Sequence, residues 1–157
     1  MNVIAVGRLK SGPERQLVER YVERVQPLAR SLGFGGVDIA ELAESPARHG
    51  ETRKAEEAQV LLGRCAAGPL VAFDERGAAL TSETFAVKLG QWRDEGRGDI
   101  SFVIGGPDGL DAQVRSRAAL VVSFGGMTMP HQLVRVLVLE QLYRSMTILS
   151  GHPYHRV

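Results

Sequence analysis

The chain of 157 residues contains a single cysteine, Cys65, so it can form neither an intrachain disulfide nor a cysteine-based zinc site. It also has no uninterrupted apolar segment of about 18 residues, the length that a membrane-spanning helix needs. The apolar run from Met1 to Gly7 is too short for a secretory signal and has no positively charged leader. These absences predict a cytoplasmic protein that has no membrane partner.

A strong excess of charge of one sign is also missing. The 19 Lys and Arg residues nearly balance the 18 Asp and Glu residues, which leaves a formal net charge of +1. An RNA partner would therefore have to be held by a local group of cations. The hydrophobic fraction of 44% and the charged fraction of 24% are typical of a globular protein, and we expect one domain over residues 1–157.

Several nucleotide-binding and catalytic motifs are absent. The segment 7–12 (GRLKSG) follows the first apolar run but lacks the G-x-G-x-x-G spacing of dinucleotide-binding domains. This argues against a nicotinamide-dependent oxidoreductase and against the common Rossmann-type methyltransferases. Neither a Walker A motif nor a G-x-S-x-G motif occurs, which excludes P-loop NTPases and α/β-hydrolases.

Short apolar runs alternate with amphipathic segments along the whole chain. The runs predict strands at residues 2–7, 37–42, 70–74, 100–104 and 120–124. The amphipathic segments predict helices that start at Ser11 as a cap, near 55, at Thr81 or Ser82, after Asp111 and at Pro130, with a kink at Pro27 in the first. This alternation predicts an α/β fold with a mainly parallel sheet of five to six strands and helices on both faces.

Two glycine-rich loops follow the fourth and fifth predicted strands. Residues 105–109 (GGPDG) have the composition of a tight turn, and residues 124–131 (FGGMTMPH) lead into a helix N-terminus. Ligands of parallel sheets bind at the carboxyl ends of the strands, so these loops favour a shared pocket with soft apolar walls, suited to an adenine or a thioether. A plain turn and methionines that fill the core are the alternatives. The polar segment 43–50 is a candidate lid or surface tether.

The C-terminal segment 151–156 (GHPYHR) combines a group that titrates near neutral pH, an aromatic ring and a guanidinium. It has no carboxylate or cysteine beside its histidines, so we expect no metal site. A frayed terminus is the other interpretation. Two groups of cations could hold RNA phosphates or lie on solvated helix faces: Arg8, Lys10, Arg15, Arg20 and Arg24 near the N-terminus, and Arg135 and Arg144 on the last helix.

Three segments, in this order, resemble the ribosomal RNA large subunit methyltransferase H family of SPOUT methyltransferases: 104–110 (IGGPDGL), 129–138 (MPHQLVRVLV) and 152–156 (HPYHR). The resemblance covers essentially the whole chain. It implies a SPOUT fold with a C-terminal trefoil knot, which is a rare exception among folds, and a homodimer. It also implies N3-methylation of a pseudouridine in 23S ribosomal RNA, with S-adenosylmethionine as the donor and the assembled 70S ribosome as the preferred substrate.

The resemblance also implies roles for individual residues. The cofactor site would be lined by Phe73, Gly105, Phe124, Gly125, Gly126, Met127, Thr128 and Met129. In the tail, His155 is the candidate base, Arg156 the stabiliser of an anion or phosphate, and Tyr154 a stacking or orienting partner. The family often has Leu in place of Phe73, which keeps an apolar wall, and Glu in place of Asp108, whose role is open.

Two alternative functions remain open. A knotted methyltransferase that modifies a ribose hydroxyl of transfer RNA would use the same cofactor loops, although the HPYHR tail argues against it. A non-catalytic ribosome-associated factor would keep the fold without the activity. Affinity for S-adenosylmethionine separates the second alternative from an enzyme.

Overall fold

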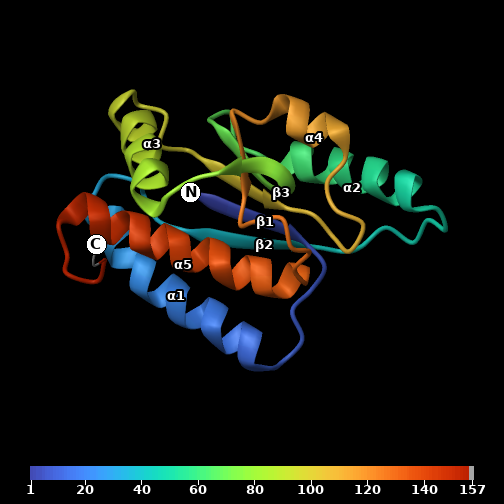
Figure 1. Cartoon of the computed structure of the whole chain (residues 1–157), viewed down its shortest axis with the longest axis horizontal. Helices are drawn as coiled ribbons and strands as arrows, with labels where there is room; N and C mark the ends of the chain where they lie inside the picture. Colours follow the sequence, from blue (N-terminus) through green and yellow to red (C-terminus); the bar gives the residue numbers. More distant parts are fainter. Residues whose placement is uncertain (156–157) are drawn as a thin grey trace.

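Strands and helices alternate from one end of the chain to the other in the computed structural model, which describes residues 1–155 (Figure 1). In chain order the elements are β1 (Asn2–Val6), α1 (Pro13–Ser31), β2 (Asp38–Leu42), α2 (Gly50–Arg64), β3 (Leu70–Ala79), α3 (Ser82–Asp94), β4 (Ser101–Ile104), α4 (Ala112–Arg117), β5 (Leu120–Ser123) and α5 (His131–Ser150). The predicted alternation is therefore confirmed.

The five strands form one sheet in the order β2-β1-β4-β3-β5, and all four neighbouring pairs are parallel. The prediction of a mainly parallel sheet is confirmed, with five strands in the described residues. Because β3 lies between β4 and β5, the two glycine-rich loops do not follow neighbouring strands. They meet instead across the carboxyl end of β3.

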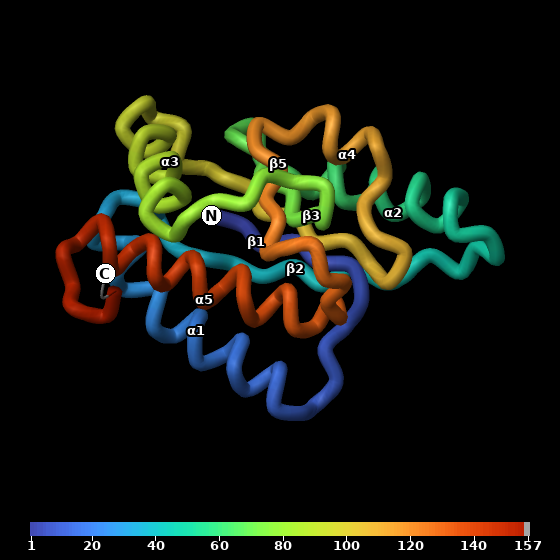
Figure 2. The backbone as a smooth tube through the Cα atoms, viewed as in Figure 1, coloured from blue at the N-terminus to red at the C-terminus, as the bar shows by residue number. Residues whose placement is uncertain are grey.

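Helices cover both faces of the sheet (Figures 1 and 2). Val3 and Ala5 of β1 belong to an apolar cluster that also contains buried residues of α1, α3 and α5. Ile4 and Val6, on the opposite face of the same strand, belong to a second cluster with α2 and α4. Burial on both faces explains why the strands have apolar runs rather than alternating polar residues. None of the helices within residues 1–155 is long and apolar enough to cross a bilayer.

The first helix differs from its prediction at its N-cap. Its N-cap is Gly12, and no side chain caps it, so the predicted cap at Ser11 is wrong. The helix also continues through Pro27 to Ser31. Val25 and Ala29, on either side of the proline, are fully buried, and this tertiary packing keeps the segment helical.

The strand β3 extends beyond its predicted end at residue 74. Both Phe73 and Ala78 are in register with Val122 of β5, so residues 74–77 bulge out of the ladder. A Cβ atom at Gly77 would lie 2.6 Å from the carbonyl carbon of Val122, a separation that no larger residue tolerates. The glycine thus permits a bulge that places three polar residues, 74–76, at the carboxyl edge of the sheet.

Candidate active site

A pocket of about 360 Å³ opens at the carboxyl ends of β3, β4 and β5. Seven of the eight residues predicted to bind a cofactor line it: Phe73, Gly105, Phe124, Gly125, Met127, Thr128 and Met129. The eighth, Gly126, is exposed in the same loop and is not on the pocket wall. The structure thus brings three distant segments together, and their role in cofactor binding stays a prediction.

The segment 105–109 forms both a tight turn and a wall of this pocket. The backbone N–H of Gly109 donates to the carbonyl of Gly106 at 3.0 Å, and Gly109 has a φ of +82°. A Cβ atom on Gly105 would lie 2.7 Å from the backbone of Gly109. Only glycine fits at 105, because the turn folds back directly against it.

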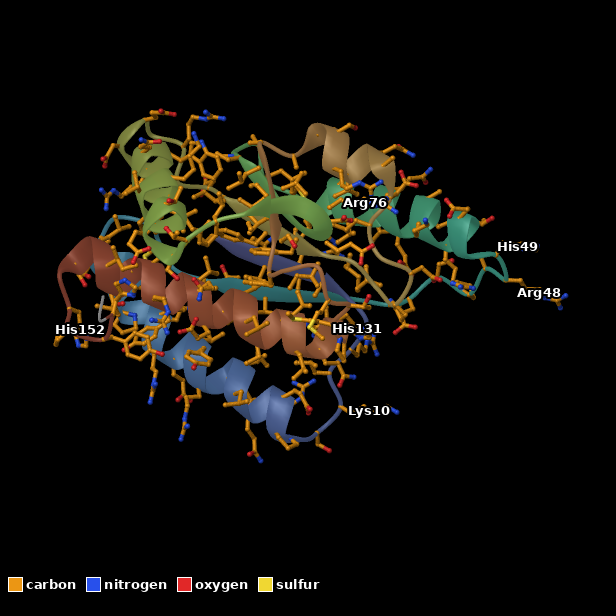
Figure 3. All side chains as sticks on the ribbon, in the orientation of Figure 1. Lys10, Arg48, His49, Arg76, His131 and His152 are labelled. Carbon is orange, nitrogen blue, oxygen red and sulfur yellow. The ribbon has the colours of Figure 1, made fainter. Side chains whose placement is uncertain are left out.

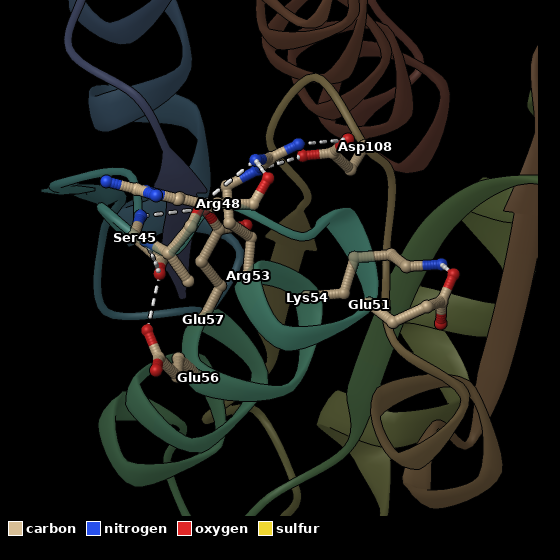
Figure 4. A network of polar contacts seen from close by, with 9 residues as sticks. Ser45, Arg48, Glu51, Arg53, Lys54, Glu56, Glu57 and Asp108 are labelled. Atoms are coloured by element: carbon tan, nitrogen blue, oxygen red, sulfur yellow. Dashed lines mark hydrogen bonds and ion pairs between the residues drawn. The ribbon is translucent and has the colours of Figure 1, made fainter.

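Asp108, whose role the sequence left open, fastens this turn to α2. The Nε and Nη2 atoms of Arg53 donate to its two carboxylate oxygens at 2.7 and 2.9 Å (Figure 4). The same guanidinium donates to the carbonyls of Ala47 and Arg48. The hydrogen bonds from Arg53 hold the pKa of Asp108 below its ordinary value, so the carboxylate remains charged. This bidentate pair links the pocket wall to the segment before α2.

The segment 43–50 is a tether rather than an open lid. The backbone N–H of Ser45 donates to Glu57 Oε1 at 3.0 Å, and the hydroxyl of Ser45 donates to Glu56 (Figure 4). Glu57 is only 6% exposed, and this burial raises the pKa of its carboxyl group, against the lowering effect of the Ser45 hydrogen bond. These contacts fix the connection between β2 and α2 beside the pocket.

The bulge in β3 adds charges of both signs to the pocket. Asp74 Oδ2 lies 3.2 Å from Arg115 Nη1, and Asp74 Oδ1 accepts a hydrogen bond from the backbone N–H of Arg76 at 3.0 Å. Glu75 and Arg76 are exposed, and Lys54 pairs with Glu51 at 2.7 Å. Asp74, Glu75, Arg76, Arg115 and Lys54 all line the pocket, which can therefore bind the two ends of an amino-acid zwitterion.

Arg135 neither faces RNA nor lies on a solvated helix face, and both interpretations of its sequence position are wrong. Its side chain is 0% exposed. Its Nη1 atom donates to Glu41 Oε1 at 2.5 Å, and its Nη2 atom donates to the carbonyl of Gly7 at 2.9 Å. Burial lowers the pKa of Arg135 and the pairing with Glu41 raises it. The residue holds the first turns of α5 against the ends of β1 and β2.

His131, in the first turn of α5, also lines the pocket. Its Nε2 atom lies 3.1 Å from the position of a Cβ on Gly7, where the backbone has a φ of +86°. Burial, followed by the charge of Arg135, lowers the pKa of His131. The imidazole is therefore neutral at pH 7 and can accept a hydrogen bond.

Tyr154 lies outside this pocket, on the surface of α5. Its ring packs edge-on against Tyr143 with centroids 4.7 Å apart, and its hydroxyl donates to Glu140 Oε1 at 3.2 Å. Burial is the first cause that raises the pKa of Tyr154 to about 12. The phenol therefore acts as a hydrogen-bond donor and fits the predicted orienting role better than that of a base.

His155 lies between α3 and α5. Its Nε2 atom is 2.5 Å from Glu83 Oε1, and its Nδ1 atom is 3.3 Å from Arg144 Nη1. Since a guanidinium can only donate, Nδ1 accepts from Arg144 and Nε2 carries the proton that Glu83 accepts. Arg156, predicted as an anion stabiliser, lies outside the described residues. Within residues 1–155, no three His, Cys, Asp or Glu side chains are grouped to hold a metal ion.

The residues that connect the site to its surroundings were not found from the sequence. Arg53, Arg115 and Glu41 gave no local signal for their pairing, because Asp108, Asp74 and Arg135 lie 55, 41 and 94 residues away from them along the chain. Gly77 was also missed, although a glycine within a strand is a known sign of a bulge. Of these four residues, only Gly77 could have been identified from the sequence.

Glycine-rich loops folded over a pocket at the carboxyl ends of a parallel sheet define a ligand-binding α/β protein. The family model described as predicted SPOUT methyltransferase matches residues 1–155. The chain therefore is a SPOUT methyltransferase. Within that class it belongs to the ribosomal RNA large subunit methyltransferase H family, as its similarity to curated relatives shows.

Two of these relatives match over nearly their whole length. Identity is 58% to ribosomal RNA large subunit methyltransferase H of Bradyrhizobium sp. (strain ORS 278), over 98% of this chain and 96% of the relative. Identity is 55% to the protein of the same name from Rhodopseudomonas palustris (strain TIE-1), over 98% of this chain and 97% of the relative. A solved structure of a probable methylase family protein from Haemophilus influenzae Rd KW20 has a TM-score of 0.51 at 11% identity, covering 99% of this chain and 70% of that chain. This likeness supports the fold alone.

Proposed function

We propose that this protein transfers a methyl group from S-adenosylmethionine to N3 of a pseudouridine in 23S ribosomal RNA. The observation that carries the proposal is the pocket formed by the ends of β3, β4 and β5, together with membership of the methyltransferase family. The printed names of the relatives supply the RNA substrate class. The pseudouridine and its N3 atom come from the resemblance of the HPYHR tail.

The residues present fit the cofactor. Phe73, Phe124 and Met129 provide apolar walls for an adenine and a thioether. Glu75 and Arg76 on the bulge provide opposite charges for an ammonium and a carboxylate. When bound, S-adenosylmethionine supplies an electrophilic methyl group on a positively charged sulfur, which is left as a neutral thioether after transfer.

The protein has two tasks in such a reaction. It must hold the target nitrogen in line with the methyl carbon, which is worth several orders of magnitude in rate, and it must accept the proton that N3 loses. His155 is the proposed base, oriented by its hydrogen bond to Glu83. Its basic Nδ1 atom accepts from Arg144, so substrate binding has to displace Arg144 from that atom.

The protein acts on the assembled 70S ribosome as a cytoplasmic homodimer. Leu17 and Leu133 are 37% and 44% exposed, and they lie in the first two turns of α1 and α5, which pack side by side. Exposed leucines on paired helices favour a second copy as the partner. Sedimentation equilibrium should give twice the mass of 17.0 kDa.

The test is transfer of labelled methyl from S-adenosylmethionine to purified 70S ribosomes that lack the modification, followed by mapping of the labelled nucleoside. We expect label on N3-methylpseudouridine. His155→Ala should lower kcat by about 100-fold or more, the usual worth of a positioned base, while cofactor affinity stays unchanged. His49→Ala, an exposed histidine before α2, is the matched control.

The opposite results distinguish the alternatives. Cofactor binding without any labelled ribosome would favour a transfer RNA ribose methyltransferase. Absence of both cofactor binding and methyl transfer would favour a non-catalytic ribosome-associated factor. Normal turnover by the His155→Ala variant would contradict a catalytic role of the tail.

A further inference from the structure

A second pocket, of about 240 Å³, adjoins the first. The two pockets share five residues: Phe73, Val122, Ser123, Phe124 and Gly125. The remaining wall of the second pocket is formed by the end of β3, the start of α3 and the middle of α5, with Thr81, Ser82, Phe85 and Gln141 among its residues. No sequence pattern indicates this second pocket.

A shared wall is the arrangement that a transfer between two bound molecules requires. The donor carbon and the acceptor nitrogen must approach to about 3–3.5 Å, so the target base has to lie directly beside the methyl donor. If the donor occupies the first pocket, the second pocket is in the right place for the acceptor.

The shared wall is aromatic. The rings of Phe73 and Phe124 are stacked, with centroids 5.3 Å apart and an interplanar angle of 8°. Phe85 packs edge-on against Phe73 at 6.4 Å. Bases that have been flipped out of RNA bind by stacking on aromatic side chains and by hydrogen bonds to their edges. Phe73 and Phe85 are only 6% and 4% exposed, so the partly exposed ring of Phe124 is the one that can provide such a surface.

The opposite wall offers an acceptor and a donor side by side. Ser82 Oγ donates to Gln141 Oε1 at 2.8 Å, which leaves the lone pairs of Ser82 Oγ available. Gln141 Nε2 donates one hydrogen to Glu140 at 2.7 Å and has a second hydrogen available. An adjacent acceptor and donor match a pyrimidine edge on which an N–H stands next to a carbonyl.

The residues that hold the C-terminal tail are sequence neighbours of two residues of this pocket. Glu83, which accepts the hydrogen bond from His155, follows Ser82 directly in the chain. Glu140, which accepts the hydrogen bond from Tyr154, directly precedes Gln141. The tail is thus joined to the same turns of α3 and α5 that carry Ser82 and Gln141.

From this geometry we infer that the second pocket binds the target base, that Ser82 selects pseudouridine over uridine, and that Gln141 positions the base. The inference rests on the proposed function. Pseudouridine is attached to its ribose through carbon and therefore has an N1–H, whereas the N1 of uridine is the glycosidic nitrogen. Ser82 Oγ accepts the N1–H and Gln141 Nε2 donates to the neighbouring O2, while N3 on the far side of O2 remains open to the methyl donor.

The first test compares methylation of 70S ribosomes that have pseudouridine at the target position with ribosomes that have uridine there. Ser82→Ala and Gln141→Leu should each lower kcat/KM on pseudouridine by about 10-fold to 100-fold, the cost of leaving one hydrogen-bonding group of the substrate unpaired. Ser82→Ala should leave the rate on uridine unchanged, whereas Gln141→Leu should lower that rate as well, because both bases carry O2. The calorimetric affinity for S-adenosylmethionine should not change in either variant. Ser116→Ala, whose hydroxyl bonds to a carbonyl in α4, is the matched control.

A second measurement works without turnover. We expect pseudouridine monophosphate, added to protein saturated with S-adenosylhomocysteine, to shift the NMR signals of the Gln141 side-chain amide and of residues 82–85 more than uridine monophosphate does. An unchanged preference in both variants, or no shift with the nucleotide, would overturn the inference. Weaker cofactor binding in the Ser82→Ala variant would also overturn it, since the pocket would then belong to the cofactor.

The two proposals fail differently. A wild-type protein that methylates neither ribosome contradicts the proposed function, and the nucleotide titration still decides whether the second pocket selects a base. Methylation of both ribosomes at equal rates supports methyl transfer and contradicts selection by Ser82.

Discussion

Glu41 connects three parts of the protein through one carboxylate. Its Oε1 atom accepts from Arg135 at 2.5 Å and from the backbone N–H of Leu9 at 2.9 Å, and its Oε2 atom lies 3.6 Å from Arg15. Arg15 also donates to the carbonyl of Leu9. Two of the cations that could have held RNA, Arg15 and Arg135, are therefore paired with a carboxylate of the protein itself, and Arg135 is fully buried there.

Removing one partner of this pair should be more harmful than removing both. Glu41→Leu leaves the fully buried guanidinium of Arg135 without its anion, and we expect the free energy of unfolding to fall by about 3–5 kcal/mol. Adding Arg135→Met removes the unpaired charge and should restore at least half of the loss. Urea denaturation of the two single variants and the double variant measures this coupling, and additive losses would contradict it.

At the scale of elements, the irregular strand β3 determines the shape of the pocket. Its first part ends at Phe73, which stacks on Phe124, and its bulge supplies the charged residues of the pocket. The close approach of Gly77 to β5 makes the bulge possible. An uninterrupted strand of the same length would keep residues 74–76 in the ladder and leave the pocket with fewer charges.

Gly77→Ala should therefore damage both stability and cofactor binding. Its added methyl group meets backbone atoms of β5 that cannot move independently, and we expect a loss of about 1–3 kcal/mol in unfolding free energy together with weaker binding of S-adenosylmethionine. Gly63→Ala is the control, because Gly63 lies in α2 with nothing within 4 Å of the added atom. That variant should gain about 0.5–1 kcal/mol. Thermal unfolding and calorimetric titration measure these effects. Equal stability and equal cofactor affinity in the Gly77→Ala and Gly63→Ala variants would contradict the role assigned to Gly77.

At the scale of the whole molecule, the near balance of charge limits RNA binding. Lys10 and Arg48 extend away from the protein in the loops after β1 and β2 (Figure 3), yet the formal net charge is only +1. Sequence-independent attraction to phosphates, which dominates non-specific affinity, is correspondingly weak. On this basis we expect recognition to depend on the shape of the assembled substrate. The trefoil knot that the resemblance implies stays a prediction.

We therefore expect naked RNA to be a poor substrate. A stem-loop that contains the target pseudouridine should be methylated at least about tenfold more slowly than the 70S ribosome at the same target concentration, because few phosphate contacts form on isolated RNA. Initial rates with labelled methyl, measured at two salt concentrations, test this. Equal rates on the stem-loop and the ribosome would show that the ribosomal context is unnecessary.

The sequence by itself determined the elements and most of the loops that line the first pocket. Apolar runs buried on both faces specify parallel strands, and the glycines of 105–109 and 124–126 mark the places where the chain must turn sharply at their ends. These are local properties, since strand burial and turn conformation depend on neighbouring residues. The predicted end of β3 at residue 74 was wrong, because the bulge that follows depends on the approach of β5, and this approach is not a local property.

The tertiary structure alone decided which side chains meet. Arg135 could be buried only because Glu41 and the carbonyl of Gly7, more than 90 residues away, meet it at the edge of the sheet. Ser82 and Gln141, 59 residues apart, lie hydrogen-bonded side by side in the wall of a pocket that no local pattern marks. Contacts of this kind are set by strand order and helix packing, which bring together residues that carry no information about each other in the linear sequence.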